Sequence, residues 1–222
     1  MPEAVQAAKW REPALGSRVL ILRHAETSQP YIFHGAESDV GLSNRGLRQA
    51  EAVAPIIAAE QPVAVVSSAM RRAVQTARPI ALACGVPIIE ESELHERRVG
   101  AMSGTSTSGD NSIWAATLAR WKAGDLGFAP EGAESFIDIQ NRVLPVWDHL
   151  ASQFSGETWV LVVHGLVIRA LLIGLIPEFQ PFGWHMIGIS HVAINELCRN
   201  ENRWVVARLH DRVIPEELVD SV

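Results

Sequence analysis

Three points in the sequence place arginine, histidine or serine directly after a run of apolar residues that is typical of a β-strand. They are Arg23-His24, the stretch from Ser67 to Arg72, and His164-Gly165. Because the carboxyl ends of parallel strands meet at one edge of a sheet, we expect these three points to converge. Guanidinium groups stay charged and can hold two phosphate oxygens at once, and an imidazole with one nitrogen fixed can act as a nucleophile. Each point alone is weak, but together they predict a site for phosphoryl chemistry.

Strands and helices that alternate along the chain must position these groups. We expect strands over 18–24, 62–66, 86–90 and 158–163, and a late hairpin from 191–197 and 203–209 around Asn200-Glu201-Asn202. We expect helices over 43–60 with Ser43 as N-cap, over 70–83 ending at Gly85, and over 166–176 before Pro177. This order predicts an α/β fold of three layers, α/β/α, with a mostly parallel sheet covered by helices on both faces.

The chain is predicted to form a single domain over residues 18–222 after a polar leader, 1–17. The segment from about 100 to 134 interrupts the alternation with several glycines, among them Gly109, around one helical stretch near 112–123. We interpret it as an inserted lid over the carboxyl ends of the strands, where sheets of this class bind ligands.

Composition limits the possible partners. The 222 residues carry a net charge of −6 without a block of lysines and arginines, which argues against nucleic acid or an anionic membrane surface as partner. The longest apolar run, 166–176, is shorter than the roughly 18 residues of a membrane helix, and the leader lacks the apolar core of a signal peptide. Cys84 and Cys198 are expected to be reduced thiols, although a disulfide is possible. We therefore expect a soluble, cytoplasmic protein with neither metal nor cofactor.

Several sequence blocks resemble those of a known family. Arg23-His24-Ala25-Glu26-Thr27 is similar to the Arg-His-Gly-Glu-Thr signature of the histidine phosphatase superfamily, in its phosphoglycerate mutase-like branch. Further blocks in the family's order are Asp39 to Ala50, Ser67 to Ala77, Leu94 to Gly100, Gly132 to Ser135 and Val162 to Ala170. Together they span residues 18 to about 170.

The resemblance implies a role for each matching residue. His24 would be the nucleophile that forms a phosphohistidine. Arg23, Arg72 and His164 would line the phosphate pocket. Glu96 would protonate the leaving group and then activate water. The implied ligand is a small phosphorylated substrate or inorganic phosphate.

Other ionisable residues are assigned less directly. Glu26 is included among the substrate-binding residues, with a structural salt bridge as an equal alternative. Arg71, next to Arg72, is expected to be a solvated helix residue. The remaining histidines are expected to be structural or exposed, with His149 on a helix: His34, His95, His149, His185, His191 and His210.

Departures from the family pattern concern the substrate end of the pocket. Pro30 stands where many members carry a phosphate-binding Asn, and Ile32 lies near a position often held by Arg. The mutase branch uses paired arginines in its insertion, whereas 104–134 offers Arg120 and Lys122. The segment 104–134 of this chain also contains large apolar residues, which predict either an apolar lid or a helix that packs its own core. They are Trp114, Leu118, Trp121 and Phe128.

We therefore predict a phosphomonoester hydrolase. The alternatives are a phosphoglycerate mutase-type phosphotransferase and a non-catalytic binding module on the same fold. A small-molecule substrate and a phosphoprotein are not distinguished by the sequence, and it predicts no oligomeric state.

Overall fold

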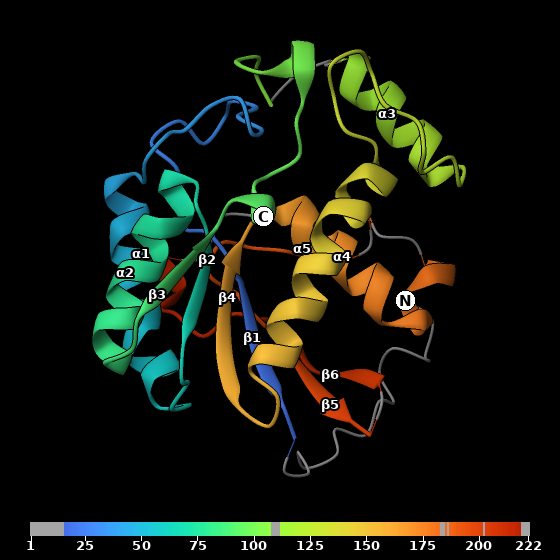
Figure 1. The fold of residues 1–222 in the computed structure, drawn as a ribbon. Helices are drawn as coiled ribbons and strands as arrows, with labels where there is room; N and C mark the ends of the chain where they lie inside the picture. The colour runs from blue at the N-terminus through green and yellow to red at the C-terminus, as the bar shows by residue number, and fades with distance from the viewer. Residues whose placement is uncertain (1–15, 108–111, 183–184, 186, 202, 219–222) are drawn as a thin grey trace.

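A single sheet of six strands forms the centre of the protein, whose computed structural model describes residues 16–107, 112–182, 185, 187–201 and 203–218 (Figure 1). The strands are β1 Arg18–Arg23, β2 Val65–Ser68, β3 Ile88–Glu91, β4 Thr158–Val163, β5 Ile194–Asn200 and β6 Arg203–Asp211. Their order is β3-β2-β4-β1-β5-β6; the first four are parallel, and β5 and β6 are antiparallel additions at one edge. The predicted mostly parallel α/β sheet is confirmed.

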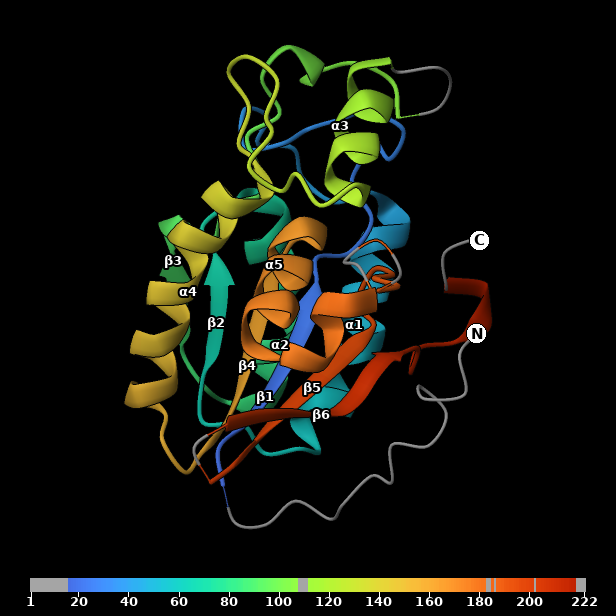
Figure 2. The same ribbon diagram turned by 90° about the vertical axis from the view of Figure 1, so that its right-hand side faces the viewer.

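Helices cover both faces of this sheet (Figures 1 and 2). They are α1 Asn44–Ala58 and α2 Arg71–Cys84 on one face, and α4 Phe136–Gln153 and α5 Gly165–Leu175 on the other; a further helix, α3 Ser112–Lys122, lies outside these layers. Alternate residues of β1 face opposite layers: Val19 and Ile21 pack in the core under α4 and α5, and Leu20 and Leu22 in the core under α1 and α2. Both faces of β1 and β4 are buried, and these strands are apolar except at Arg18, Arg23 and Thr158. The three-layer prediction is confirmed.

Local signals set most helix ends as predicted. The Ser43 hydroxyl accepts a hydrogen bond from the Gly46 N–H at 2.9 Å and caps α1. Gly85 ends α2 with φ +67°, a conformation that glycine adopts without steric cost. At α4, Ser135 and Asp138 form a reciprocal capping box, so His149 lies on a helix as expected.

Several strand limits were predicted wrongly. Ser67 and Ser68, expected to follow the second strand, are its last two residues and are fully buried. The Ser67 hydroxyl donates a hydrogen bond to the Ser68 carbonyl, and the Ser68 hydroxyl is hydrogen-bonded to Nε2 of His164. Because both hydroxyls are hydrogen-bonded inside the protein, these polar side chains can continue a buried strand. The strands of the hairpin begin or end two to three residues later than expected.

The segment 100–134 contains a short 3₁₀ turn, Gly100–Met102, and α3. Figures 1 and 2 show α3 beyond the carboxyl ends of the strands, the position expected for a lid. The Glu37 carboxylate fastens the start of the segment by accepting hydrogen bonds from the Val99 and Gly100 N–H groups at 2.9 Å. Residues 1–15 of the leader, Gly109 and Asn202 lie outside the described residues, and the single-domain assignment stays a prediction.

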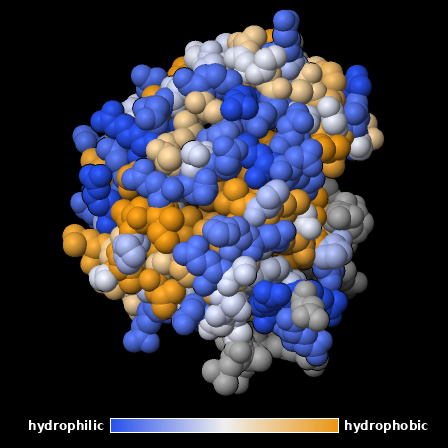
Figure 3. Space-filling view, viewed as in Figure 1, coloured by the Kyte–Doolittle hydropathy of each residue, from blue (hydrophilic) through white to orange (hydrophobic). Residues whose placement is uncertain are grey.

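The surface in Figure 3 is largely hydrophilic, with hydrophobic side chains gathered across the middle of that face. The large apolar side chains that are exposed come from several different elements: Tyr31, Leu47, Val63, Leu82, Ile113 and Ile137. Exposed apolar side chains of this kind are usual on folded proteins. Among the described residues, no helix has the length and hydropathy needed to cross a membrane.

Candidate active site

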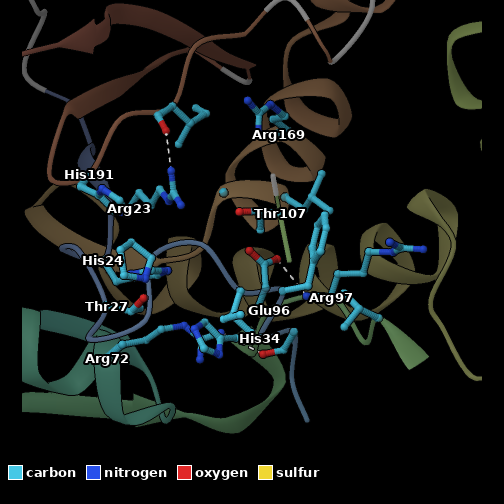
Figure 4. A pocket seen from close by; sticks show the side chains of 18 of the residues that line it. Arg23, His24, Thr27, His34, Arg72, Glu96, Arg97, Thr107, Arg169 and His191 are labelled. Atoms are coloured by element: carbon cyan, nitrogen blue, oxygen red, sulfur yellow. Dashed lines mark hydrogen bonds between the residues drawn. The ribbon is translucent and has the colours of Figure 1, made fainter. Parts of the chain in front are cut away.

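A pocket of about 290 Å³ opens at the carboxyl ends of the parallel strands, and Thr107 and Trp114 of the segment 100–134 help to line it (Figure 4). Its polar lining comes from β1, α2, α5 and the loops around them: Arg23, His24, Thr27, His34, Arg72, Glu96, Arg97, Thr107, Arg169 and His191. Apolar side chains complete it: Pro30, Ile32, Phe33, Val99, Trp114, Leu166 and Ile189. Three of the predicted strand-end groups, Arg23, His24 and Arg72, therefore share one cavity, and Glu96 joins them.

His24 follows β1 and is 5% exposed. Its Nδ1 lies 2.8 Å from the Ala25 carbonyl oxygen, and because a carbonyl can only accept, Nδ1 must carry the proton. The lone pair is then on Nε2. Burial, followed by the charge of Arg72, lowers the pKa of His24 well below its usual value, so the ring is neutral near pH 7. A neutral imidazole in this tautomer is competent as a nucleophile.

The loop that carries His24 is attached to both neighbouring elements. The His24 N–H donates to the Val163 carbonyl of β4 at 2.8 Å, which extends the strand pairing by one residue. The Ala25 N–H donates to the Thr76 hydroxyl of α2 at 2.9 Å, and that hydroxyl donates in turn to the Arg72 carbonyl. The nucleophile and the first turn of α2 are thereby held in a fixed relation.

Arg72 lies in the first turn of α2 and is 2% exposed. Its Nη1 and Nη2 atoms donate to the carbonyls of Ser38 and Gly35 at 3.0 and 2.9 Å, which orient the guanidinium. Burial lowers the pKa of Arg72, and the charges of Glu96 and Asp39 act in the opposite direction. Arg71 is exposed and does not line the pocket, as expected for a solvated neighbour.

His164 lies at the end of β4 as the N-cap of α5 and is fully buried. Its ring centroid is 5.2 Å from that of His24, and its Nε2 is 2.9 Å from the Ser68 hydroxyl. Its Nδ1 has no hydrogen-bond partner among the described residues. The structure brings this ring beside His24, although it does not form part of the pocket surface.

Glu96 follows the 3₁₀ turn Ser92–Leu94 that ends the β3 region. Its Oε1 accepts a hydrogen bond from the Arg97 N–H at 2.8 Å, and Figure 4 shows the carboxylate facing the cavity across from His24. A carboxyl group at this position can exchange a proton with a group bound between the two side chains.

Glu26 does not reach the pocket, so the structure does not support its assignment as a substrate-binding residue. Its carboxylate accepts a hydrogen bond from the Ser43 hydroxyl at 2.7 Å and pairs with Arg45 at 3.3 Å. These contacts attach the His24 loop to the start of α1. They correspond to the structural salt bridge that was the alternative prediction for Glu26.

Two of the histidines expected to be structural or exposed, His34 and His191, also line the pocket. The ring of His191 is 5.7 Å from that of His24, and His34 donates through Nε2 to the Gln29 carbonyl at 2.9 Å. His191 precedes β5, which runs antiparallel to β1, so the amino end of β5 lies at the same sheet edge as the carboxyl ends of the others. The carboxyl ends of the strands alone therefore do not identify His191 as a pocket residue.

The sequence and the fold are similar to those of known phosphatases. Residues 19–212 match the model of the histidine phosphatase superfamily, branch 1. The chain belongs to this superfamily. It is 35% identical to a glucosyl-3-phosphoglycerate phosphatase of Mycolicibacterium vanbaalenii over 72% of this chain and 74% of the relative. It is 30% identical to a metal-independent phosphoserine phosphatase of Arabidopsis thaliana over 92% and 87% of the two chains. The structure of a mycobacterial glucosyl-3-phosphoglycerate phosphatase matches with a TM-score of 0.77 and 26% identity, covering 89% of this chain and all of that one.

In this histidine phosphatase, the segment 100–134 contributes an uncharged surface to the pocket. Among its described residues, Thr107 and Trp114 line the cavity, while Trp121 is buried against Phe136. Trp114 therefore contributes an apolar lid to the pocket, whereas Trp121 packs in the core. Arg120 pairs with Asp125 and stacks on Phe128, away from the pocket. The described residues contain no cluster of three or more His, Cys, Asp or Glu side chains that could hold a metal ion.

A substitution of Arg72 tests whether its charge stabilises a phosphoryl group in this pocket. Replacing it with glutamine should lower kcat/KM for any phosphomonoester about 10²- to 10³-fold, because a preorganised donor to the developing phosphoryl charge is lost. The matched control is Arg71→Gln, one residue away and outside the pocket, which should change kcat/KM little. Steady-state kinetics on an aryl phosphate measures both, and equal effects of the two substitutions would contradict the assignment of Arg72.

Proposed function

We propose that this protein hydrolyses small phosphomonoesters through a phosphohistidine intermediate on His24. The observation that carries the proposal is the tautomer of His24, whose Nδ1–H is held by the Ala25 carbonyl and whose Nε2 lone pair is available. Arg23 and Arg72 line the pocket with it, and Glu96 faces it. A nucleophile, two cations and a proton donor are the groups that phosphoryl transfer requires.

The proposed reaction has two steps. In the first, Nε2 of His24 forms a bond to phosphorus while the bond to the leaving oxygen breaks, and protonated Glu96 gives its proton to that oxygen. In the second, Glu96 takes a proton from water as the water oxygen attacks phosphorus, and the bond to Nε2 breaks to release inorganic phosphate. Arg23 and Arg72 offset the negative charge of the phosphoryl oxygens in both steps. His164, which lies behind the pocket surface, packs its ring beside that of His24.

Hydrolysis is favoured over mutase chemistry by the lining of the pocket. A phosphotransferase has to retain its phosphorylated product and protect the phosphohistidine from water. The segment 100–134 of this chain offers Thr107 and Trp114 to the cavity, whereas its Arg120 is engaged with Asp125. A non-catalytic module is disfavoured because the whole predicted set of catalytic residues is retained: Arg23, His24, Arg72, Glu96 and His164.

The substrate class follows from the size and charge of the cavity. A pocket of about 290 Å³ with several cations fits a small phosphorylated metabolite. The names of the relatives, glucosyl-3-phosphoglycerate phosphatase and phosphoserine phosphatase, agree with a substrate of this kind. The cytoplasmic location stays a prediction.

A phosphate-release assay over a panel of phosphorylated metabolites, run beside a phosphoglycerate mutase assay, tests this function. We expect release of inorganic phosphate from small phosphomonoesters without transfer between positions of a phosphoglycerate. Activity should also persist in excess chelator, because the mechanism uses the protein's own groups. A strict requirement for an added metal, or transfer faster than hydrolysis, would contradict the proposal.

A further inference from the structure

Arg169 is a pocket cation to which the proposed reaction gives no role. It lies in α5, five residues after His164, and its side chain lines the same cavity as His24. Figure 4 shows it across the pocket from Arg72. Its Nε donates to the Ile187 carbonyl at 3.2 Å, which fixes the plane of the guanidinium, and its Nη atoms make no hydrogen bond to another described residue.

Arg169 and Arg23 approach each other over Gly165. A methyl group added to Gly165 would lie 3.6 Å from Arg169 Nη1 and 3.8 Å from Arg23 Nε. Both groups carry positive charge, and burial together with the charge of Arg23 lowers the pKa of Arg169 to about 10. The charge of Glu96 acts in the opposite direction. An anion bound beside Arg169 would offset this positive charge.

The pocket also has an apolar lining that offers no charge to a substrate. Pro30, Ile32 and Trp114 belong to this lining, and Trp114 packs edge-to-face on Phe33 with ring centroids 5.8 Å apart. The additional pocket arginine, Arg97, is 1% exposed and already stacks on Trp121 at 4.8 Å, and Figure 4 shows it extending away from His24. Arg169 is thus the cation best placed to meet the part of a substrate that is not transferred.

We propose that Arg169 determines specificity by binding a carboxylate on the leaving group, so that the preferred substrates are phosphorylated carboxylic acids. This inference rests on the proposed function and names its substrate class. The two Nη donors of a guanidinium whose plane is fixed match the two oxygens of a carboxylate. The scissile phosphate would lie between His24, Arg23 and Arg72, and the carboxylate would lie toward Arg169.

A matched pair of substrates tests the proposal. 3-Phosphoglycerate and glycerol 3-phosphate differ in a carboxylate against a hydroxymethyl group at the end remote from the phosphate. We expect the wild-type protein to have the higher kcat/KM for 3-phosphoglycerate. Arg169→Gln should reduce this preference about 10- to 100-fold, the usual contribution of hydrogen bonds to a charged group. Arg169→Lys keeps the charge but lacks the two parallel Nη donors, and it should retain part of the preference.

The control is Arg120→Gln, which removes an exposed arginine outside the pocket and should leave the preference unchanged. Equal losses for both substrates in Arg169→Gln would overturn the proposal, since Arg169 would then act on the transferred phosphate or hold the loop at Ile187. A wild-type protein without preference for the carboxylate would overturn it as well, even if Arg169→Gln does not fold. Hydrolysis of an aryl phosphate by the wild-type protein is measured in parallel, and its absence would contradict the proposed function itself.

Discussion

Replacing His24 with alanine should abolish phosphatase activity, with a loss on the order of 10⁴-fold or more in kcat, as for other enzymes that lose their nucleophile. The physical reason is that Nε2 of His24 is the atom to which the phosphoryl group is transferred. Without it, water has to attack the substrate directly. Steady-state release of phosphate from an aryl phosphate measures the loss.

A second measurement separates loss of the nucleophile from damage to the fold. Rapid quenching of the wild-type protein with labelled substrate should trap an acid-labile phosphoryl–nitrogen bond, and His24→Ala should trap none. His149→Ala, an exposed histidine on α4, is the matched control and should keep both turnover and labelling. Substantial turnover by His24→Ala, or labelling of another histidine in it, would contradict the role of His24.

Replacing Glu96 with glutamine should slow hydrolysis of alkyl phosphates by about 10²- to 10⁴-fold, the range expected for a lost general acid. Glutamine keeps an oxygen that can accept the hydrogen bond from the Arg97 N–H, so the local geometry is preserved while the transferable proton is removed. An activated aryl phosphate, whose leaving group needs no proton, should lose far less in its phosphorylation step.

The comparison of the two leaving groups is the decisive measurement for Glu96. Single-turnover kinetics with glycerol 3-phosphate and with dinitrophenyl phosphate separates phosphorylation from the later attack of water. Glu93→Gln, an exposed carboxylate three residues earlier, is the control and should affect neither substrate. If Glu96→Gln slows phosphorylation by both substrates equally, Glu96 is not the proton donor.

Much of the architecture could be predicted because the central strands β1 and β4 are buried on both faces. Thr158–Val163 is almost entirely apolar, and its limits as a strand were predicted without error. Ser43 and Gly85 mark helix ends through backbone chemistry that is local to the sequence. Ser67 and Ser68 misled the prediction because two serines suggest a loop, while tertiary contacts supply partners for both hydroxyls.

The sequence by itself determined which groups are available for chemistry at the strand ends. The joint presence of His24, Arg72 and Glu96 in ordered motifs predicts phosphoryl transfer, since strand direction and the connections of an α/β fold bring such points to one edge. Their gathering in a single pocket agrees with that prediction. Their catalytic roles are what the substitutions test.

Only the tertiary structure decided which further side chains line the pocket. Glu26 is two residues from His24 but turns to Ser43 and Arg45, whereas His191 enters the pocket from the amino end of an antiparallel strand. Arg169 reaches the same cavity because α5 starts beside Arg23 at Gly165. The direction of a side chain depends on the path of its loop and on partners distant in the sequence, so neither residue type nor spacing could specify it.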